Sequence, residues 1–467
     1  MSARLVPLIV ATALFMENLD ATVLATALPA MARDLGADPV HMKLALTSYL
    51  LALAVCVPAS GWIADRFGSR RVFVGAVLVF TAASVLCGLA RTLPELVLWR
   101  LAQGLGGAMM VPVGRLVVLK TTPKEGLVGA MTWFTVPALM GPLLGPPLGG
   151  LVVTVATWHW AFWLNVPIGL GGALLAFRLL PDVAEARRAP FDAAGFFLLA
   201  GGLVLLVSAA TLAGVGRLGL RKDLALAAAG AGLLALYVRH AGRTADPVLD
   251  LSLLKLPTFR ASALGGLPFR VGIAATPFLL PLMLQLGFGL SPLASGLTTF
   301  ATGAGAIALK LFAQPVLDRF GFRNTLVWNG LGAAAVAATP ALFTGATPPW
   351  AMAAALFVGG LLRSLQFTAV NAIAYAEVEP ARMGAATAFS AVVQQVSASL
   401  GVSLAALELD ASRAWHGHAT VASSDFTAAF LGVALVAALS TFAFLHLPRD
   451  AARNLASRPP SPRPQHG

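Results

Sequence analysis

The chain has 467 residues, of which 58% are hydrophobic and only 11% carry a charge. This composition is far too apolar for a soluble domain and is typical of a protein that resides in a bilayer. The formal net charge of +12 would fit a nucleic-acid partner, but its excess lies in short loops and in a tail that contains Arg449, Arg453, Arg458 and Arg463. Membrane topology and contact with anionic lipid account for it without nucleic acid.

Apolar runs about 20 residues long, enough to cross the hydrocarbon core of a membrane, follow one another along the whole chain. We therefore predict an all-α integral membrane protein with fourteen transmembrane helices. They are expected over residues 5–28, 43–63, 72–90, 94–119, 127–153, 160–180, 193–213, 223–239, 258–285, 292–313, 324–343, 350–373, 383–406 and 426–446.

The first run contains Glu17 and Asp20 in its second half and has no convincing small-residue cleavage site. It therefore predicts a retained helix rather than a secretory signal. Lys and Arg are concentrated in the loops on the side of the N-terminus, as expected of the cytoplasmic side. Both termini are accordingly expected in the cytoplasm.

A short charged loop between the second and third runs is the most informative motif. It supplies Gly61, Asp65, Arg66, Gly68, Arg70 and Arg71, and a damaged copy after the tenth run supplies Asp318 and Arg319. The Asp65 carboxylate could meet an Arg or the N-terminus of a neighbouring helix and latch one conformation shut. Alternatively, the basic residues only anchor the loop at the inner surface. In the second copy Asn324 replaces the last Arg, which weakens the expectation of a gate there.

The repeated loop indicates two parallel six-helix repeats. We assign residues 1–180 to the first bundle and residues 258–446 to the second. Residues 181–257 are predicted to form a two-helix insertion with polar linkers. Residues 447–467, rich in Pro and Arg, are predicted to be a disordered cytoplasmic tail.

The fifth run combines small residues at a four-residue spacing, which let another helix approach closely, with prolines that bend the helix. The residues concerned are Gly141, Gly145, Pro146, Gly149 and Gly150. At the least, this pattern predicts a close packing face.

Together these segments resemble the major facilitator superfamily, in particular its fourteen-helix drug:proton antiporter branch. The resemblance extends over about residues 5–446 and also rests on Leu19 to Thr22, Arg100 to Gly104, Trp158 to Trp160 and Pro281 to Gln285. It implies two six-helix bundles with two helices inserted between them, in the inner membrane of a bacterium. It further implies that the fifth-run motif seals the pathway against leak, and that Arg100 takes part in a proton relay or holds a carboxylate in place.

Charges embedded in the apolar runs each cost a few kcal/mol unless they face a cavity or a partner. They are Glu17, Asp20, Arg100, Arg115, Arg270, Lys310 and Arg363. Asp20 could carry the coupling proton, neutral when desolvated and ionised when water enters, or could form a permanent ion pair with an embedded cation. Glu17, three residues earlier on the same face, would titrate with it as a coupled pair.

Cations outnumber acids in this set, so a cavity lined by them should favour an anion. The resemblance places Arg115, Arg270, Lys310 and Arg363 on helices that border the central cavity, although Arg115 could instead snorkel to the inner surface. Four polar side chains complete the predicted cavity set, and the three in the second bundle could bind cargo or tie helices together by hydrogen bonds. They are Gln103, Gln285, Gln366 and Asn371.

His416 and His418 fall in an outer loop and are predicted to be solvated rather than to bind a metal. Cys56 and Cys87 are predicted to be packing residues. No metal or cofactor is expected, because the proton gradient would drive the transport. The expected partners are a small-molecule substrate, protons and the lipid bilayer, with a monomer sufficient for function.

We predict a proton-coupled antiporter that exports small molecules from the cytoplasm by alternating access. Its cargo would be lipophilic, often cationic drugs, as the family suggests, or organic anions such as a carboxylate or its metal chelate, as the embedded cations suggest. A membrane-embedded enzyme or sensor would need a catalytic or ligand cluster that the sequence lacks. A channel would not need a duplicated gate.

Overall fold

The computed structural model describes residues 5–123, 126–183, 190–213, 219–310, 312–448 and 451–452. Within these ranges the chain is helical and contains no strand. Fourteen helices are long and apolar enough to cross a membrane, which confirms the predicted number. Most of the predicted tail, residues 447–467, lies outside the described residues.

The first six spans come from eight α-helices and two short 3-10 turns. The helices are α1 (Leu5–Asp34), α2 (Lys43–Cys56), α3 (Ser60–Phe67), α4 (Ser69–Cys87), α5 (Leu93–Thr121), α6 (Leu127–Val155), α7 (Trp160–Trp163) and α8 (Asn165–Leu179). The turns η1 (Pro39–Met42) and η2 (Val57–Ala59) extend α2 and join it to α3. Two further spans, α9 (Ala193–Leu212) and α10 (Leu220–Ala241), follow as a pair.

The last six spans are more broken. Their elements are η4 (Leu251–Lys255), α11 (Pro257–Arg260), η5 (Ala261–Gly265), α12 (Leu267–Ala274), α13 (Thr276–Leu282), η6 (Met283–Gly287), α14 (Pro292–Lys310), α15 (Ala313–Phe320), α16 (Phe322–Asn324), η7 (Thr325–Asn329), α17 (Gly330–Ala337), η8 (Thr339–Leu342), α18 (Pro349–Ile373), η9 (Pro380–Arg382), α19 (Met383–His416) and α20 (Ser423–Leu445). In the ninth span, Pro268, Pro277 and Pro281 remove backbone donors, which explains why it is built from short pieces joined by π-helical turns.

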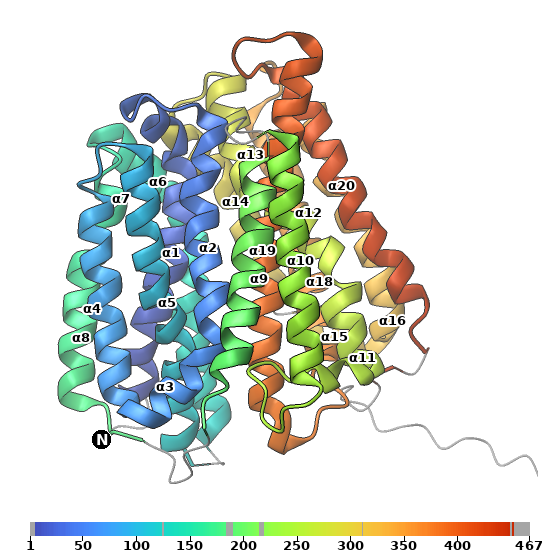
Figure 1. Cartoon of the computed structure of the whole chain (residues 1–467). Helices are drawn as coiled ribbons and strands as arrows, with labels where there is room; N and C mark the ends of the chain where they lie inside the picture. The colour runs from blue at the N-terminus through green and yellow to red at the C-terminus, as the bar shows by residue number, and fades with distance from the viewer. Residues whose placement is uncertain are drawn as a thin grey trace, which may run out of the picture.

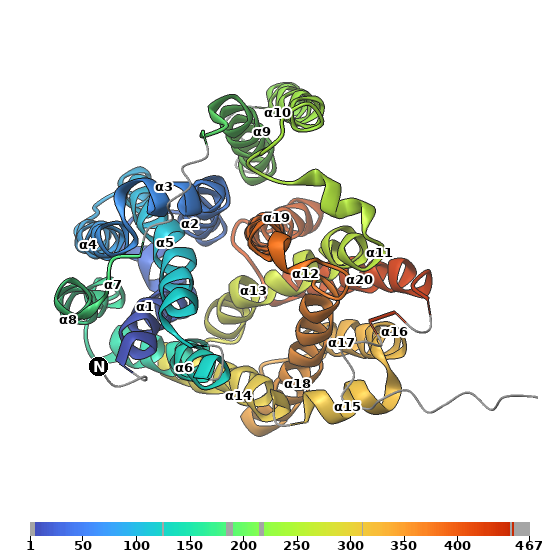
Figure 2. The ribbon, with the colours of Figure 1, turned by 90° about the horizontal axis from the view of Figure 1, so that it is seen from below.

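The helices run between two ends of the molecule. We call the end that holds Leu5 and the turn after α3 the Asp65 end, and the opposite end, which holds η1 and the loop after α19, the Asp38 end. The Asp65 end is at the bottom of Figure 1 and faces the viewer in Figure 2. The last helix, α20, returns to the Asp65 end, so both ends of the described chain lie there.

The inserted pair lies to one side of the other helices (Figure 2). Helix α9 packs against α10, and it also contacts α2 of the first six spans and α19 of the last six. Near the Asp38 end of α9, the Lys43 ammonium donates to the Ala213 carbonyl at 3.1 Å, and the Thr211 hydroxyl bonds the Ser403 hydroxyl at 2.9 Å. The pair is therefore bonded to both groups of helices.

The two copies of the charged loop share one backbone feature. Gly68, between α3 and α4, has φ of 90°, and Gly321, between α15 and α16, has φ of 74°. Side chains other than hydrogen rarely tolerate this conformation. The glycine recurs because each copy turns the chain sharply between two helices.

The predicted span boundaries differ from the structure by up to ten residues, and the largest difference is at the end of the thirteenth span. The thirteenth span was expected to end at residue 406, but α19 continues to His416. Hydropathy falls after that point because Glu408, Asp410 and Arg413 are charged, whereas helical hydrogen bonding continues without regard to hydropathy. These three charges consequently lie on a helix and not in a loop.

Candidate functional site

The embedded acid Asp20 lies inside the first group of helices, where three side chains bind its carboxylate. Arg100 Nη1 of α5 lies 2.6 Å from Oδ2, while Gln103 Nε2 and Asn165 Nδ2 donate to Oδ1 at 2.9 and 2.8 Å. All four residues are almost completely buried. The structure therefore shows Asp20 in the ion pair that the sequence left as one of two alternatives, and it adds Asn165, which the sequence analysis missed.

Besides Asp20, Arg100 contacts Ala45, Tyr49 and Gln103. Its Nε donates to the Ala45 carbonyl of α2 at 3.0 Å, its Nη1 also donates to Gln103 Oε1 at 2.6 Å, and its guanidinium lies 4.3 Å from the centre of the Tyr49 ring. Gln103 reaches α4 through a 2.8 Å bond to the Ser84 hydroxyl. Removing one partner of such a buried pair leaves an uncompensated charge.

Glu17 lies on the same helix, one turn nearer the Asp65 end, and is half-buried. Its Oε2 is buried and makes no hydrogen bond within the described part of the chain. Unlike Asp20, Glu17 can therefore gain a hydrogen bond at Oε2 without breaking an ion pair.

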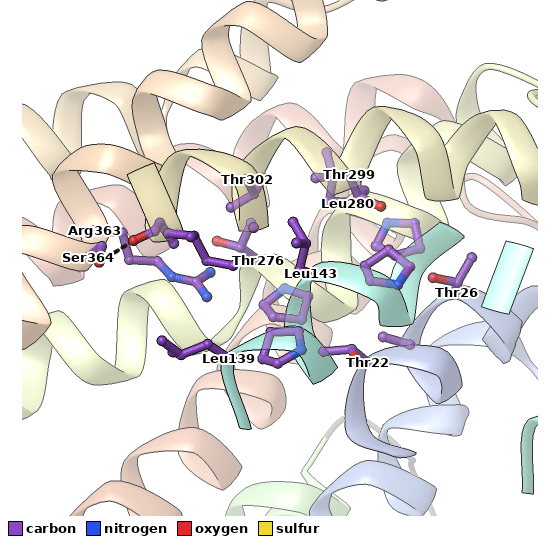
Figure 3. Close-up of a pocket in the computed structure, with 18 of the residues that line it drawn as sticks. Thr22, Thr26, Leu139, Leu143, Thr276, Leu280, Thr299, Thr302, Arg363 and Ser364 are labelled. Carbon is purple, nitrogen blue, oxygen red and sulfur yellow. Dashed lines mark hydrogen bonds between the residues drawn. The ribbon is translucent and has the colours of Figure 1, made fainter. Parts of the chain in front are cut away.

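A cavity of about 250 Å³ lies between the first six and the last six spans. Its walls come from α1, α6, α13, α14 and α18, and are mostly apolar, with several threonines (Figure 3). Arg363 extends into it on the side opposite Thr22 and Thr26. Lys310, at the end of α14, also lines it. Among the described residues, the lining thus supplies two cations and no carboxylate.

Asp20 and the cavity are on opposite sides of α1. Thr22, Ala25 and Thr26 line the cavity, whereas Asp20 faces α5 and α8. This division follows from the helical repeat, because residues two apart on a helix point in different directions. One helix thereby carries both the buried ion pair and part of the cavity wall.

Six of the eight residues predicted for the cavity lie outside its walls. Gln103 belongs to the Asp20 network, and Arg115 is exposed near the ring of Phe134. Arg270 donates to the Ser262 carbonyl at 2.6 Å and to Asn371 Oδ1 at 3.1 Å.

The remaining two tie helices together. Gln366 donates to the Leu326 carbonyl at 2.9 Å and accepts from Asn329 at 2.9 Å. Gln285 donates to the Thr26 carbonyl at 2.9 Å and so joins η6 to α1. Sequence could not orient these helix faces, and hydrogen bonding between helices was the alternative stated for the uncharged residues.

Two carboxylates make contacts at the first charged loop, that of Asp65 within the loop and that of Asp182 from outside it. Asp65 lies 3.9 Å from the Lys120 ammonium of α5. At the start of α4, the Arg70 amide donates to Asp182 Oδ1 at 3.3 Å, and a side chain at Gly68 would collide with that carboxylate. Asp182, absent from the predicted set, therefore occupies the helix N-terminus that the latch hypothesis gave to Asp65.

The other loop residues are less constrained. Gly61 has open space beside it, and Arg66 and Arg71 are exposed. In the second copy, Gln314 donates to Asp318 at 2.9 Å, and Arg319 lies 5.7 Å from the ring of Phe320. Arg323, in the same copy, donates to the Leu445 carbonyl of α20 at 2.9 Å.

The small residues of the fifth span allow two different helices to pack closely against α6. Side chains at Gly141, Gly145 and Gly149 would collide with α1, whereas one at Gly150 would collide with the backbone of Pro292 and Leu293 at the start of α14. Pro146 lines the cavity and leaves no room for a side chain at Gly296 of α14. Helix α6 is therefore packed against α1 on one side and α14 on the other.

At the Asp38 end, one ion pair joins the two groups of helices directly. Arg413 Nη1 of α19 lies 2.7 Å from Asp38 Oδ2, and the other Asp38 oxygen accepts from the Val40 amide at 2.9 Å. Burial alone would raise the pKa of Asp38, but the bonds from Arg413 and Val40 outweigh burial and bring the pKa below its ordinary value.

His416 and His418 also lie at this end, where they contact Asp425 rather than solvent alone. Their Nδ1 atoms are 3.4 and 3.0 Å from its carboxylate. That carboxylate is buried and also accepts from the Ala422 amide and the Ser412 hydroxyl, so it caps the start of α20.

Comparisons with known proteins agree with this architecture. A family model described as Major Facilitator Superfamily matches residues 10–275 and 262–465. A Klebsiella pneumoniae strain 342 protein named "Putative multidrug resistance protein MdtD" is 39% identical over 457 residues, covering 96% of this chain and 96% of the relative. An Escherichia coli strain SE11 protein of the same name is 39% identical over 453 residues, with 96% and 95% covered.

Solved structures show the same fold at low identity. The POT family transporter PepTSo matches with a TM-score of 0.68 at 15% identity, covering 95% of this chain and 97% of that one. The human organic anion transporter MFSD10 matches with a TM-score of 0.62 at 15% identity, covering 95% and 100%.

Replacing Arg100 by Met should destabilise the protein strongly, because Asp20 then remains buried without its cation. We expect a loss of about 3–5 kcal/mol of unfolding free energy, measured by unfolding of the purified protein in detergent. The double variant Asp20→Asn/Arg100→Met should lose less than Arg100→Met alone. Equal losses would contradict a stabilising charge pair.

The Asp38–Arg413 pair should make the free energy of unfolding depend on pH in the acidic range. Since the pKa of Asp38 is lower in the folded protein, its contribution is fully present above the ordinary Asp pKa and is lost as pH falls through the folded value. The effect should be no more than about 1 kcal/mol, because both partners are partly exposed. Thermal unfolding followed from about pH 6 to about pH 2 should show a smaller acid loss for Asp38→Asn, while Asp246→Asn, at an exposed position, behaves as the intact protein.

Proposed function

Because the chain belongs to the Major Facilitator Superfamily, we propose that this secondary transporter is a proton-coupled antiporter that exports small organic anions from the cytoplasm. The family consists of transporters and not of enzymes. One observation supports an anionic cargo above the others: the described residues that line the cavity between the two groups of helices include Lys310 and Arg363 but no carboxylate. A cavity of one sign concentrates ions of the opposite sign.

The cavity also suggests the shape of the cargo. Apolar residues such as Leu139, Leu143 and Leu280 alternate along its wall with threonines (Figure 3). Lys310 and Arg363 supply the charge. A carboxylate with an apolar body would match both the cations and the apolar part of the wall, since an unpaired charge in such a place is costly.

A second candidate cargo is a lipophilic cation. It is supported by the name of the bacterial relatives, which refers to multidrug resistance, and by the apolar part of the cavity wall. Against it stand the two lining cations, which would repel a positively charged drug.

For the direction of transport, we place the Asp65 end in the cytoplasm, following the distribution of Lys and Arg. Residues 1–180 and 258–446 would then be the two bodies that rock about the cavity. The Asp38–Arg413 pair and the Gln285–Thr26 bond, at 2.7 and 2.9 Å, would hold the outer side closed. Opening that side would require both to break.

Proton coupling would use the acids of α1. Protonation of Asp20 removes the charge that Arg100 binds, and the same helix supplies Thr22 and Thr26 to the cavity. A change in how α1 packs against α5 would therefore alter the cavity wall. Glu17, whose Oε2 makes no hydrogen bond to the described residues, could hold a proton on the way.

The cargo is tested with inside-out membrane vesicles that contain a pH-sensitive dye, challenged with di- and tricarboxylates and with cationic drugs. We expect the intact protein to move carboxylates, and Lys310→Ala and Arg363→Ala each to lower kcat/KM about tenfold or more, because each removes a charge-assisted contact. Lys310→Arg should retain most activity. Lys222→Ala, at an exposed position on α10, should behave as the intact protein. Carboxylate transport that survives both cavity variants would contradict the anion proposal.

The coupling acid is tested in the same vesicles by the proton flux that accompanies cargo. Asp20→Asn keeps the size of the side chain but cannot take up or release a proton, so it should abolish proton movement. Because it also leaves Arg100 without its anion, cargo binding is measured in the same sample to show that the variant is folded. If Asp20→Asn still couples proton and cargo and Glu17→Gln does not, Glu17 carries the proton. Coupling in both variants would exclude the acids of α1.

A further inference from the structure

A second hollow lies on the outer face of the first six spans, away from the central cavity. It is a groove of about 410 Å³ between α4 and α8 at the Asp65 end. Its apolar part is formed by Val74, Gly75, Leu78 and Phe177. Leu78 and Phe177 are 44% and 64% exposed, so the groove opens on a surface that faces the hydrocarbon in a membrane-spanning bundle.

The rim of the groove is basic. Arg70 and Arg71, in the first turn of α4, line it directly, and the exposed Arg178 follows Phe177 in the last turn of α8. None of the three takes part in an ion pair among the described residues. One acid, Asp182, contacts Arg70, but its carboxylate accepts a hydrogen bond from the backbone amide and not from the guanidinium.

The order of these groups along the membrane normal is that of a phospholipid. The arginines lie at the helix ends, where phosphate groups of the bilayer are found, and the apolar walls continue from them toward the middle of the bundle. Basic pockets between transmembrane helices bind acidic head groups in this manner. A free phosphate would match only the basic rim, because it has no apolar part to pack against the walls.

We propose that this groove binds an anionic glycerophospholipid, with its phosphate on Arg70 and Arg71 and one acyl chain along Val74, Leu78 and Phe177. A zwitterionic lipid has the same phosphate and chains, but its ammonium group opposes the basic rim. Selectivity for net negative charge is therefore the distinguishing property of the site.

Gly75 offers a variant that blocks the groove without damaging the fold. A Cβ built at this position meets nothing within 4 Å, so a larger side chain would occupy the groove rather than the protein core. Gly232, on α10, is exposed and equally open. It provides the same substitution on a remote lipid-facing helix.

The test uses the purified full chain in a neutral detergent, with bound lipid counted by native mass spectrometry and thermal stability measured in parallel. Phosphatidylglycerol, phosphatidylcholine and inorganic phosphate are titrated separately. We expect one phosphatidylglycerol to bind and to raise Tm, phosphatidylcholine to bind more weakly, and inorganic phosphate to have no effect. Gly75→Leu should abolish this binding, and Arg70→Ala and Arg71→Ala should each weaken it about fivefold.

Two variants serve as controls. Gly232→Leu and Arg239→Ala, the latter an exposed arginine near the end of α10, should bind phosphatidylglycerol as the intact protein does. Equal binding of the two lipids, or full binding by Gly75→Leu, would overturn the proposal. Stabilisation by inorganic phosphate equal to that by phosphatidylglycerol would also overturn it, since it would show an ion site with no role for the acyl chain.

Discussion

The buried pair of Asp20 and Arg100 is the constraint on which the first group of helices depends. Hydrocarbon offers no water to either charge, so each must be compensated inside the protein. The structure does this completely, with ligands from α2, α5 and α8 and an aromatic ring over the guanidinium. Because Arg100, Gln103 and Asn165 all bind Asp20, the position of α1 is fixed by electrostatics as much as by packing.

Helix α1 also takes part in both proposed steps, the binding of the proton and the binding of the cargo. One face holds the ion pair. The other contributes Thr22 and Thr26 to a cavity whose charged lining residues, in the part of the chain that the structure describes, are cations. Proton and anion would therefore never need to share a binding site. Coupling between them would be carried by the packing of a rigid element with two arrangements, and the glycine face of α6 allows α1 to lie close enough for such a change to be felt across the cavity.

Sequence predicted the parts of this structure that depend on order along the chain. The number of spans follows from apolar length, and the turns at Gly68 and Gly321 follow from a repeated motif. Orientation about each helix axis could not be obtained in this way, so Gln103 and Arg270 were assigned to a cavity that they do not line. Contacts between distant residues were also out of reach. Asp38 and Arg413 are 375 positions apart, and Asn165 is a single polar residue in an apolar run.

The bonds made by α9 limit how the molecule can move. Lys43 belongs to one group of helices and Ser403 to the other, and both are bonded to the same few residues at the end of α9. If both bonds persist, that point stays fixed relative to two bodies that turn against each other. In a rotation only the points on the axis have this property. The pivot of any such motion would then pass beside the inserted helices, and the widest swing would occur on the far side, where α6 and α14 meet.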